Sequence, residues 1–199
     1  MKSENKYIGD DKFKKFLEHY ECHMPLEIIK MRFIGAICSP NADLRPTDVI
    51  ASFWENNTSP RLETKKEAEL FFKFFMGLWD EMFSLVSLNK ITFNKISLND
   101  DFKLICQNRS EQIEYGFIEG FWGGKEDAKL PVYIAEVIDS LSNLADTYQI
   151  LANKTVSSEN NDIIFKNIIE CDKIVIKSIQ FIIENYTLPR INELKRVVN

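Results

Sequence analysis

Two histidines, His19 and His23, are the first residues in the chain whose spacing could support chemistry. Four residues apart, they would lie on one face of a helix with Glu18 and Cys22 nearby, as metal ligands often do. The order is H-x-E-x-H, however, so Glu21 is one place off the metalloprotease motif H-E-x-x-H, and no third histidine follows. The sequence therefore predicts a surface pair and no bound metal, with metal binding by the two histidines as the open alternative.

The four cysteines are isolated from one another and form no C-x-x-C pair: Cys22, Cys38, Cys106 and Cys171. This pattern is typical of reduced, mostly buried thiols in a cytosolic protein and not of a disulfide framework. A Ser–His or Cys–His nucleophile would have to use one of the two histidines, and no G-x-S-x-G turn is present. We therefore expect no catalytic residue and no cofactor.

The stretch 112–124, QIEYGFIEGFWGG, contains four of the seven glycines. It matches neither the phosphate-binding motif G-x-x-x-x-G-K-[ST] nor the dinucleotide motif G-x-G-x-x-G. On a helix, Gly116 and Gly120 share one face with Ile113, Phe117 and Phe121. Each interior glycine costs about 1 kcal/mol relative to alanine. Close packing of another helix against this face is the expected compensation, and contact with a ligand is the alternative.

Length and composition predict one soluble domain over residues 1–199, with 1–9 flexible. Hydrophobic residues make up 45% of the chain and include 15 phenylalanines, enough for one aromatic-rich core. The formal net charge of −5 argues against binding to nucleic acid, for which a local basic cluster at Arg190, Lys195 and Arg196 is the remaining option. The start of the chain is not a secretory signal, and charged residues interrupt the apolar segment 163–183, so we expect a cytoplasmic protein without a membrane span.

Apolar residues recur at helical spacing along most of the chain, and prolines and polar residues mark the boundaries. We expect an all-α fold, a compact bundle of about seven or eight helices. Their approximate ranges are 10–20, 25–38, 46–55, 64–88, 97–124, 131–152 and 162–186, followed by a short tail helix within 187–199 that Pro189 separates from the rest. The expected breaks include Asn56-Asn57 and a polar loop over Asn153–Asn161.

The segment 64–88 is predicted to be the central helix of this bundle. Thr64 and Glu67 form a T-x-x-E capping box, in which each side chain bonds the other residue's backbone N–H. Polar positions fall in one narrow stripe, and most other positions are apolar, among them Phe71, Phe72 and Phe75. We therefore expect burial on most of its circumference, with an exposed aromatic groove for a partner as the alternative.

Several short motifs resemble the YecA/YgfB-like family of bacterial helical proteins. They are Phe33-Ile-Gly-Ala36 with Ser39-Pro40 and Pro46-Thr-Asp-Val-Ile50, then Gly116-Phe-Ile-Glu-Gly120, and later Val137–Ala145 and the closing segment 162–176. The resemblance spans most of the chain and implies an all-helical fold, a bacterial cytoplasmic setting and no catalytic residues. Longer relatives carry a cysteine-rich zinc-binding tail, and because nothing of the kind follows Cys171, the resemblance implies no zinc.

The residues expected to matter most form a helix-packing motif: Phe33, Gly35, Ala36, Pro40, Pro46, Gly116, Phe117 and Gly120. Asp139 and Asn143 are expected on the polar face of their helix and not in a metal site. With no chemistry assigned, we expect a non-enzymatic interaction or regulatory protein that binds another protein through exposed helix faces, and a homodimer is a further option. The alternative is a small-molecule binder or enzyme with an aromatic-lined pocket between helices.

Overall fold

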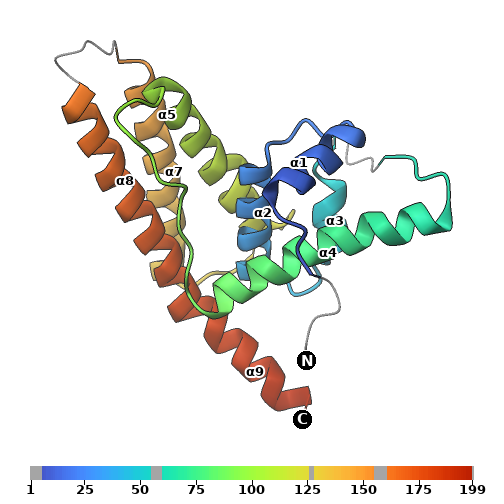
Figure 1. The fold of residues 1–199 in the computed structure, drawn as a ribbon. Helices are drawn as coiled ribbons and strands as arrows, with labels where there is room; N and C mark the ends of the chain where they lie inside the picture. Colours follow the sequence, from blue (N-terminus) through green and yellow to red (C-terminus); the bar gives the residue numbers. More distant parts are fainter. Residues whose placement is uncertain (1–5, 55–59, 126–127, 155–160, 199) are drawn as a thin grey trace.

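The computed structural model describes residues 6–54, 60–125, 128–154 and 161–198, and this part of the chain is all-helical (Figure 1). Its α-helices are α1 (Asp10–His19), α2 (Leu26–Cys38), α3 (Pro46–Ala51), α4 (Lys65–Ser87), α5 (Phe102–Glu111), α6 (Glu119–Trp122), α7 (Val132–Ala152), α8 (Asn161–Ile182) and α9 (Leu188–Val198). Two π-helical turns, η2 (Gln112–Ile118) and η3 (Ile183–Thr187), join α5 to α6 and α8 to α9. The described residues thus form seven continuous helical segments, and the predicted all-α fold is confirmed.

Helix α2 lies between two groups of helices (Figure 1). On one side are α1, α3 and α4, and on the other are α5, α7 and α8. Ten of the thirteen residues of α2 are buried, so it is the most enclosed of the described α-helices. No helix in the described part of the chain combines the length and the apolar character that crossing a membrane requires.

The long helix α4 carries the centre of the aromatic core. Its Phe75 ring has centroid distances of 5.0 to 6.5 Å to the rings of Phe13, Phe16, Phe33, Phe53, Trp54 and Phe71. The burial of α4 is narrower than expected, because the helix packs one side on α1, α2 and α3 and leaves Leu70, Phe72 and Phe83 exposed. The expectation that α4 is buried on most of its circumference is therefore wrong.

The glycine stretch packs against α2 so closely that the two backbones touch. A Cβ atom added at Gly120 would lie 2.2 Å from the carbonyl oxygen of Arg32, and one added at Gly35 would lie 2.1 Å from that of Phe117. At Gly116 the nearest atom would be Met31 Cβ at 2.7 Å. None of these separations is compatible with a side chain unless the backbones move apart. The glycines therefore give α2 room to approach η2 and α6.

The remaining motif residues surround this contact. Phe33 and Phe117 are fully buried in the core and Ala36 is nearly so. Pro40 follows the end of α2, and Pro46 occupies the first position of α3, where its missing N–H costs nothing. The motif residues thus lie on or beside α2.

A buried arginine from α2 holds the π turn that contains Gly116. The Glu119 amide donates to the carbonyl of Glu114, five residues back, which is the π pattern. The carbonyl of Tyr115, which an α-helix would offer to Glu119, accepts instead from Arg32 Nε at 2.7 Å. Arg32 also donates to the Ser52 hydroxyl at 3.1 Å and pairs with the Glu119 carboxylate. Burial lowers the pKa of Arg32, and Glu119 opposes this effect.

Pro189 does not separate the last helix from the one before it. Residues 161–198 are helical throughout, and Pro189 is the second residue after η3. In a regular α-helix the proline ring would meet the carbonyl four residues earlier, that of Asn185. A π turn widens the helix at this point, which is a known way to accommodate such a residue. The prediction of a separate tail helix is therefore wrong, although the helix itself is present.

The N-terminal segment lies along α4. A Cβ added at Gly77 would be 3.0 Å from the carbonyl oxygen of Lys6, and Tyr7 packs on the core and donates to Asp10 at 2.8 Å. Residues 1–5 of the segment expected to be flexible lie outside the described residues, as do the break at Asn56-Asn57 and positions 155–160 of the expected polar loop.

Candidate binding site

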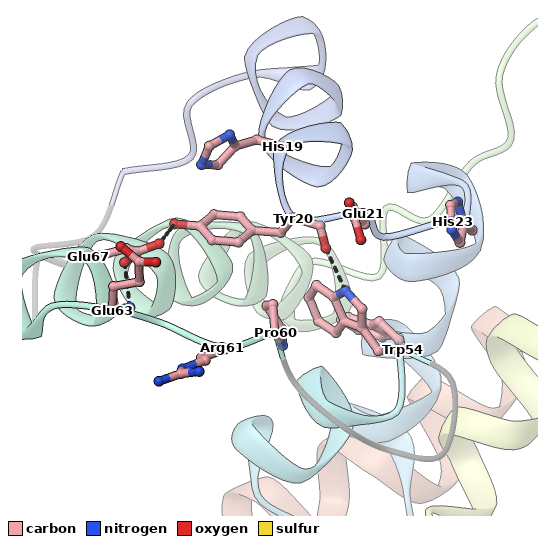
Figure 2. Close-up of a pocket in the computed structure, with 10 residues that line it drawn as sticks. His19, Tyr20, Glu21, His23, Trp54, Pro60, Arg61, Glu63 and Glu67 are labelled. Atoms are coloured by element: carbon pink, nitrogen blue, oxygen red, sulfur yellow. Dashed lines mark hydrogen bonds between the residues drawn. The ribbon is translucent and has the colours of Figure 1, made fainter.

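A cavity of about 740 Å³ lies between the end of α1, the end of α3 and the start of α4 (Figure 2). The aromatic residues and the proline that line it are Tyr20, Phe53, Trp54 and Pro60. The charged or imidazole-bearing residues that line it are His19, Glu21, His23, Arg61, Glu63 and Glu67. We call this cavity the aromatic–acidic pocket.

A left-handed residue at the end of α1 shapes one side of the pocket. Helix α1 ends at His19, and Glu21 has a φ of +52°, which is uncommon for a residue with a side chain. The chain turns there, so His23 does not share a helix with His19, and in Figure 2 the two imidazoles lie on opposite sides of Glu21. The prediction that both histidines lie on one helical face is therefore wrong. The two histidines do not form an i, i+4 pair on a helix, because the chain turns at Glu21, before His23.

The same turn positions Tyr20 and Trp54. The backbone carbonyl of Tyr20 accepts a hydrogen bond from Trp54 Nε1 at 2.8 Å. The Trp54 ring packs on Phe71 at 5.8 Å, and the Tyr20 ring packs edge-on against Phe71 at 5.0 Å. Tyr20 and Trp54 are both only half-buried, although Phe53 beneath them is buried. Two aromatic side chains are thus held in place with part of their surface open to the cavity.

The first turn of α4 supplies the carboxylate at the opposite end. The Glu67 carboxylate accepts from the Glu63 backbone amide at 2.8 Å and from the Tyr20 hydroxyl at 3.2 Å. The predicted cap is present, since Thr64 Oγ1 accepts from the Glu67 amide at 3.1 Å, but Glu67 reaches back to Glu63 and not to Thr64. The bond from the Glu63 amide lowers the pKa of Glu67, and burial followed by the bond to Glu67 raises the pKa of Tyr20. Glu67 therefore remains ionised at neutral pH.

The lining of the pocket is acidic. Glu21, Glu63 and Glu67 supply three carboxylates, whereas Arg61 supplies one permanent positive charge. Such a surface can attract a cation and place it against an aromatic face. Within the described ranges, no group of three or more His, Cys, Asp or Glu side chains is arranged to hold a metal ion.

The cysteine nearest the pocket is not placed for nucleophilic chemistry. Cys22 is buried, its thiol donates to the Phe53 carbonyl oxygen at 3.6 Å, and burial raises its pKa. A raised pKa keeps the sulfur as the thiol, which is the unreactive form. This end of the pocket is therefore suited to binding.

A second polar centre, which sequence reasoning missed, lies inside the group α5, α7 and α8. Arg109 pairs with Asp172 through two hydrogen bonds of 3.1 and 3.3 Å, and Tyr148 donates to the same carboxylate at 2.6 Å. The Arg109 guanidinium also lies 4.1 Å from the centroid of the Phe93 ring. Burial, and then Asp172, raise the pKa of Tyr148. Because these groups satisfy one another, the centre joins α5, α7 and α8.

Other residues singled out in the sequence lie outside the pocket. Asp139 and Asn143 are exposed on α7, as predicted. Arg190 donates to the backbone carbonyl of Ser39 at 2.9 Å and lies 4.7 Å from the Tyr186 ring centroid, so it is engaged within the protein. The side chain of Lys195 lies outside the described residues.

Sequence reasoning also missed most of the pocket. Glu67 was predicted only as a helix cap, and Tyr20 and Trp54 only as parts of helices. One signal for the pocket was available in the sequence: Trp54 lies next to the polar Asn56-Asn57 break. Comparisons with protein-family models, with curated proteins and with solved structures find no match. The resemblance to YecA/YgfB-like proteins therefore stays a prediction.

Proposed function

We propose that this chain is a non-enzymatic interaction or regulatory protein that binds another protein at the aromatic–acidic pocket. The observation that carries the proposal is the state of Tyr20 and Trp54, which are fixed by hydrogen bonds and ring packing and yet partly exposed. Tryptophan and tyrosine in such positions contribute much of the binding energy at protein interfaces. The bacterial cytosolic setting comes from the family resemblance alone.

The surface beside the pocket supports a macromolecular partner. Leu70 lies one helical turn after Glu67 on α4 and is 48% exposed. Exposed apolar side chains next to a fixed aromatic pair are typical of an interface that is apolar inside and polar at its edge. A partner could therefore cover the start of α4 together with the pocket.

The test is affinity capture from the native host with the wild-type chain and two variants. Trp54→Ala should abolish capture of a specific partner, because it removes the largest half-exposed ring of the pocket. Tyr133→Ala is the matched control, since Tyr133 is a 46% exposed aromatic residue on α7, away from the pocket. Circular dichroism checks that both variants fold. If the two variants retain the partner equally, the pocket is not its site.

A small-molecule binder is the second candidate, and the size of the cavity favours it. Pockets that enclose small ligands measure about 300–1,000 Å³, and this one measures about 740 Å³. Native mass spectrometry of the purified protein distinguishes the two candidates. A stoichiometric mass that Trp54→Ala removes would support a small ligand, whereas its absence together with partner capture would support an interaction protein.

A further inference from the structure

The charges of the aromatic–acidic pocket are divided between its two ends. Glu63 and Glu67 lie at one end and Glu21 at the other, with the rings of Tyr20 and Trp54 between them (Figure 2). Glu21 and Glu63 are exposed, and Glu67 is held by the Glu63 amide and the Tyr20 hydroxyl. The permanent charges of the lining are three carboxylates and one arginine, Arg61, which lies on the same side as Glu63 and Glu67 in Figure 2, so the net charge favours a cationic ligand over an anionic one.

The aromatic rings add a second and independent preference for a cation. The face of a tryptophan or tyrosine ring attracts a guanidinium or ammonium group, and tryptophan does so most strongly. The chain uses this geometry elsewhere, since Arg109 lies 4.1 Å from the Phe93 centroid and Arg190 lies 4.7 Å from the Tyr186 centroid. A guanidinium suits the pocket better than an ammonium, because its plane can stack on a ring while its edge forms two hydrogen bonds to a carboxylate.

The size of the pocket indicates more than one side chain. Its volume of about 740 Å³ is that of a site for a whole small ligand, and the exposed Leu70 lies one helical turn after Glu67 of its lining. We propose that the pocket receives an arginine-bearing segment of a partner protein, with a guanidinium against Trp54 and its neighbouring carboxylates. This inference rests on the proposed function and names the chemistry that the partner must present.

A peptide pair tests the inference directly. The probe is an acetylated, amidated peptide of glycine and two arginines, and its matched control has citrulline at both arginine positions, which keeps the shape and removes the charge. Binding is followed by NMR through the Trp54 Nε1–H signal, which the variant Trp54→Phe identifies. We expect the arginine peptide to shift this signal and to bind about tenfold or more tightly than the citrulline peptide.

Two variants of the protein distinguish binding at the pocket from attraction to the overall negative charge of the protein. Glu63→Lys should weaken the arginine peptide about tenfold or more, because it reverses a charge at the pocket. Glu136→Lys, an equal charge change at an exposed position of α7, should leave binding unchanged. Equal effects of the two variants, equal binding of the two peptides, or no binding of either peptide would each overturn the inference.

A third probe distinguishes a protein segment from a free metabolite. Agmatine carries the guanidinium without a peptide backbone, and it should bind more weakly than the arginine peptide. If agmatine binds as tightly, the source of the cation is a small molecule and the partner segment is wrong. If a partner is captured through Trp54 but no arginine peptide binds, this inference fails while the proposed function stands.

Discussion

The two sides of α2 use backbone and side chains in opposite ways. Toward η2 and α6, glycines remove side chains until the backbones touch, with Gly120 lying against Arg32. Toward α1, α3 and α4, large rings fill the space and two of them, Tyr20 and Trp54, stay half-exposed. A close contact between backbones holds the fold together, whereas partly exposed rings and carboxylates can recognise another molecule. Substitutions should therefore affect stability on the first side and binding on the second.

The largest loss of stability is expected at the glycine contact. Gly120→Leu should lower the free energy of unfolding by about 3 kcal/mol and Gly120→Ala by about 2, because the new Cβ meets backbone atoms that cannot turn away. The gain in helix propensity, about 1 kcal/mol, does not offset this cost. Chemical denaturation measures both variants.

Gly77→Ala is the control for this prediction. Its Cβ would lie 3.0 Å from the carbonyl oxygen of Lys6, against 2.2 Å at Gly120, so the Lys6 segment would need to shift by only a few tenths of an ångström. We expect a change in the free energy of unfolding close to zero, because the gain in helix propensity and the cost of the closer contact are about equal. A Gly120→Ala variant with a higher denaturation midpoint and an unchanged slope would show that the close contact does not matter.

Arg32 is the polar partner of the glycine contact, and its loss should cost less. Arg32→Met leaves the Tyr115 carbonyl without its donor, and we expect a loss of about 2 kcal/mol, in the range for one buried unsatisfied acceptor. Arg32→Lys should recover part of this, since an ammonium can still donate to one of the acceptors. Denaturation of the two variants decides the point, and equal stability of Arg32→Met and wild type would contradict it.

On the pocket side, a conservative change should separate binding from stability. Trp54→Phe keeps a ring against Phe71 but loses the hydrogen bond to the Tyr20 carbonyl, which is worth about 1 kcal/mol. Partner or peptide binding should fall by about tenfold or more, because phenylalanine offers a weaker face to a cation. Parallel denaturation and binding measurements test this, and a variant that loses stability but keeps full affinity would break the comparison.

The smallest expected effect is a change in the pH dependence of stability when Glu67 is replaced. Because the pKa of Glu67 is lowered from 4.5 in the folded protein, its stabilising contribution is complete above about pH 4.5 and is lost as the pH falls through the lowered pKa. Wild type should therefore melt at a higher temperature than Glu67→Gln at pH 7, and the difference should shrink at pH 3. A difference that is the same at both pH values would show that the charge of Glu67 does not contribute.

The helices could be predicted because their signals are local. The apolar spacing of Phe13, Phe16 and Leu17 and the cap at Thr64 act within a few residues, and they form the expected helices. The face shared by Gly116 and Gly120 was also readable from spacing, but the identity of α2 as the opposing helix was not. Tertiary contacts of this kind connect residues far apart in the chain, and they leave no periodic pattern that can be recognised in a single sequence.

The pocket could not be predicted because it depends on a turn without a glycine. Glu21 adopts a left-handed conformation, which is uncommon for glutamate and is not predicted from its residue type. The turn at Glu21 separates the two histidines and orients the Tyr20 carbonyl toward Trp54. The π turn η2 was missed for a related reason, since the distant Arg32 donates to the Tyr115 carbonyl that the turn leaves free. Burial of α4 was overestimated because an apolar residue can remain exposed without penalty to the fold.

The π turn at Ile183–Thr187 also fixes the rotation of everything after it. A π turn contains one residue more than an α turn, so winding the same residues as a regular α-helix would rotate α9 about its axis by roughly 100°. Arg190 would then point away from the carbonyl of Ser39, to which it now donates at 2.9 Å. The π turn thus sets the rotation of α9 about its own axis. This rotation determines which side of α9 contacts the end of α2 and which side does not.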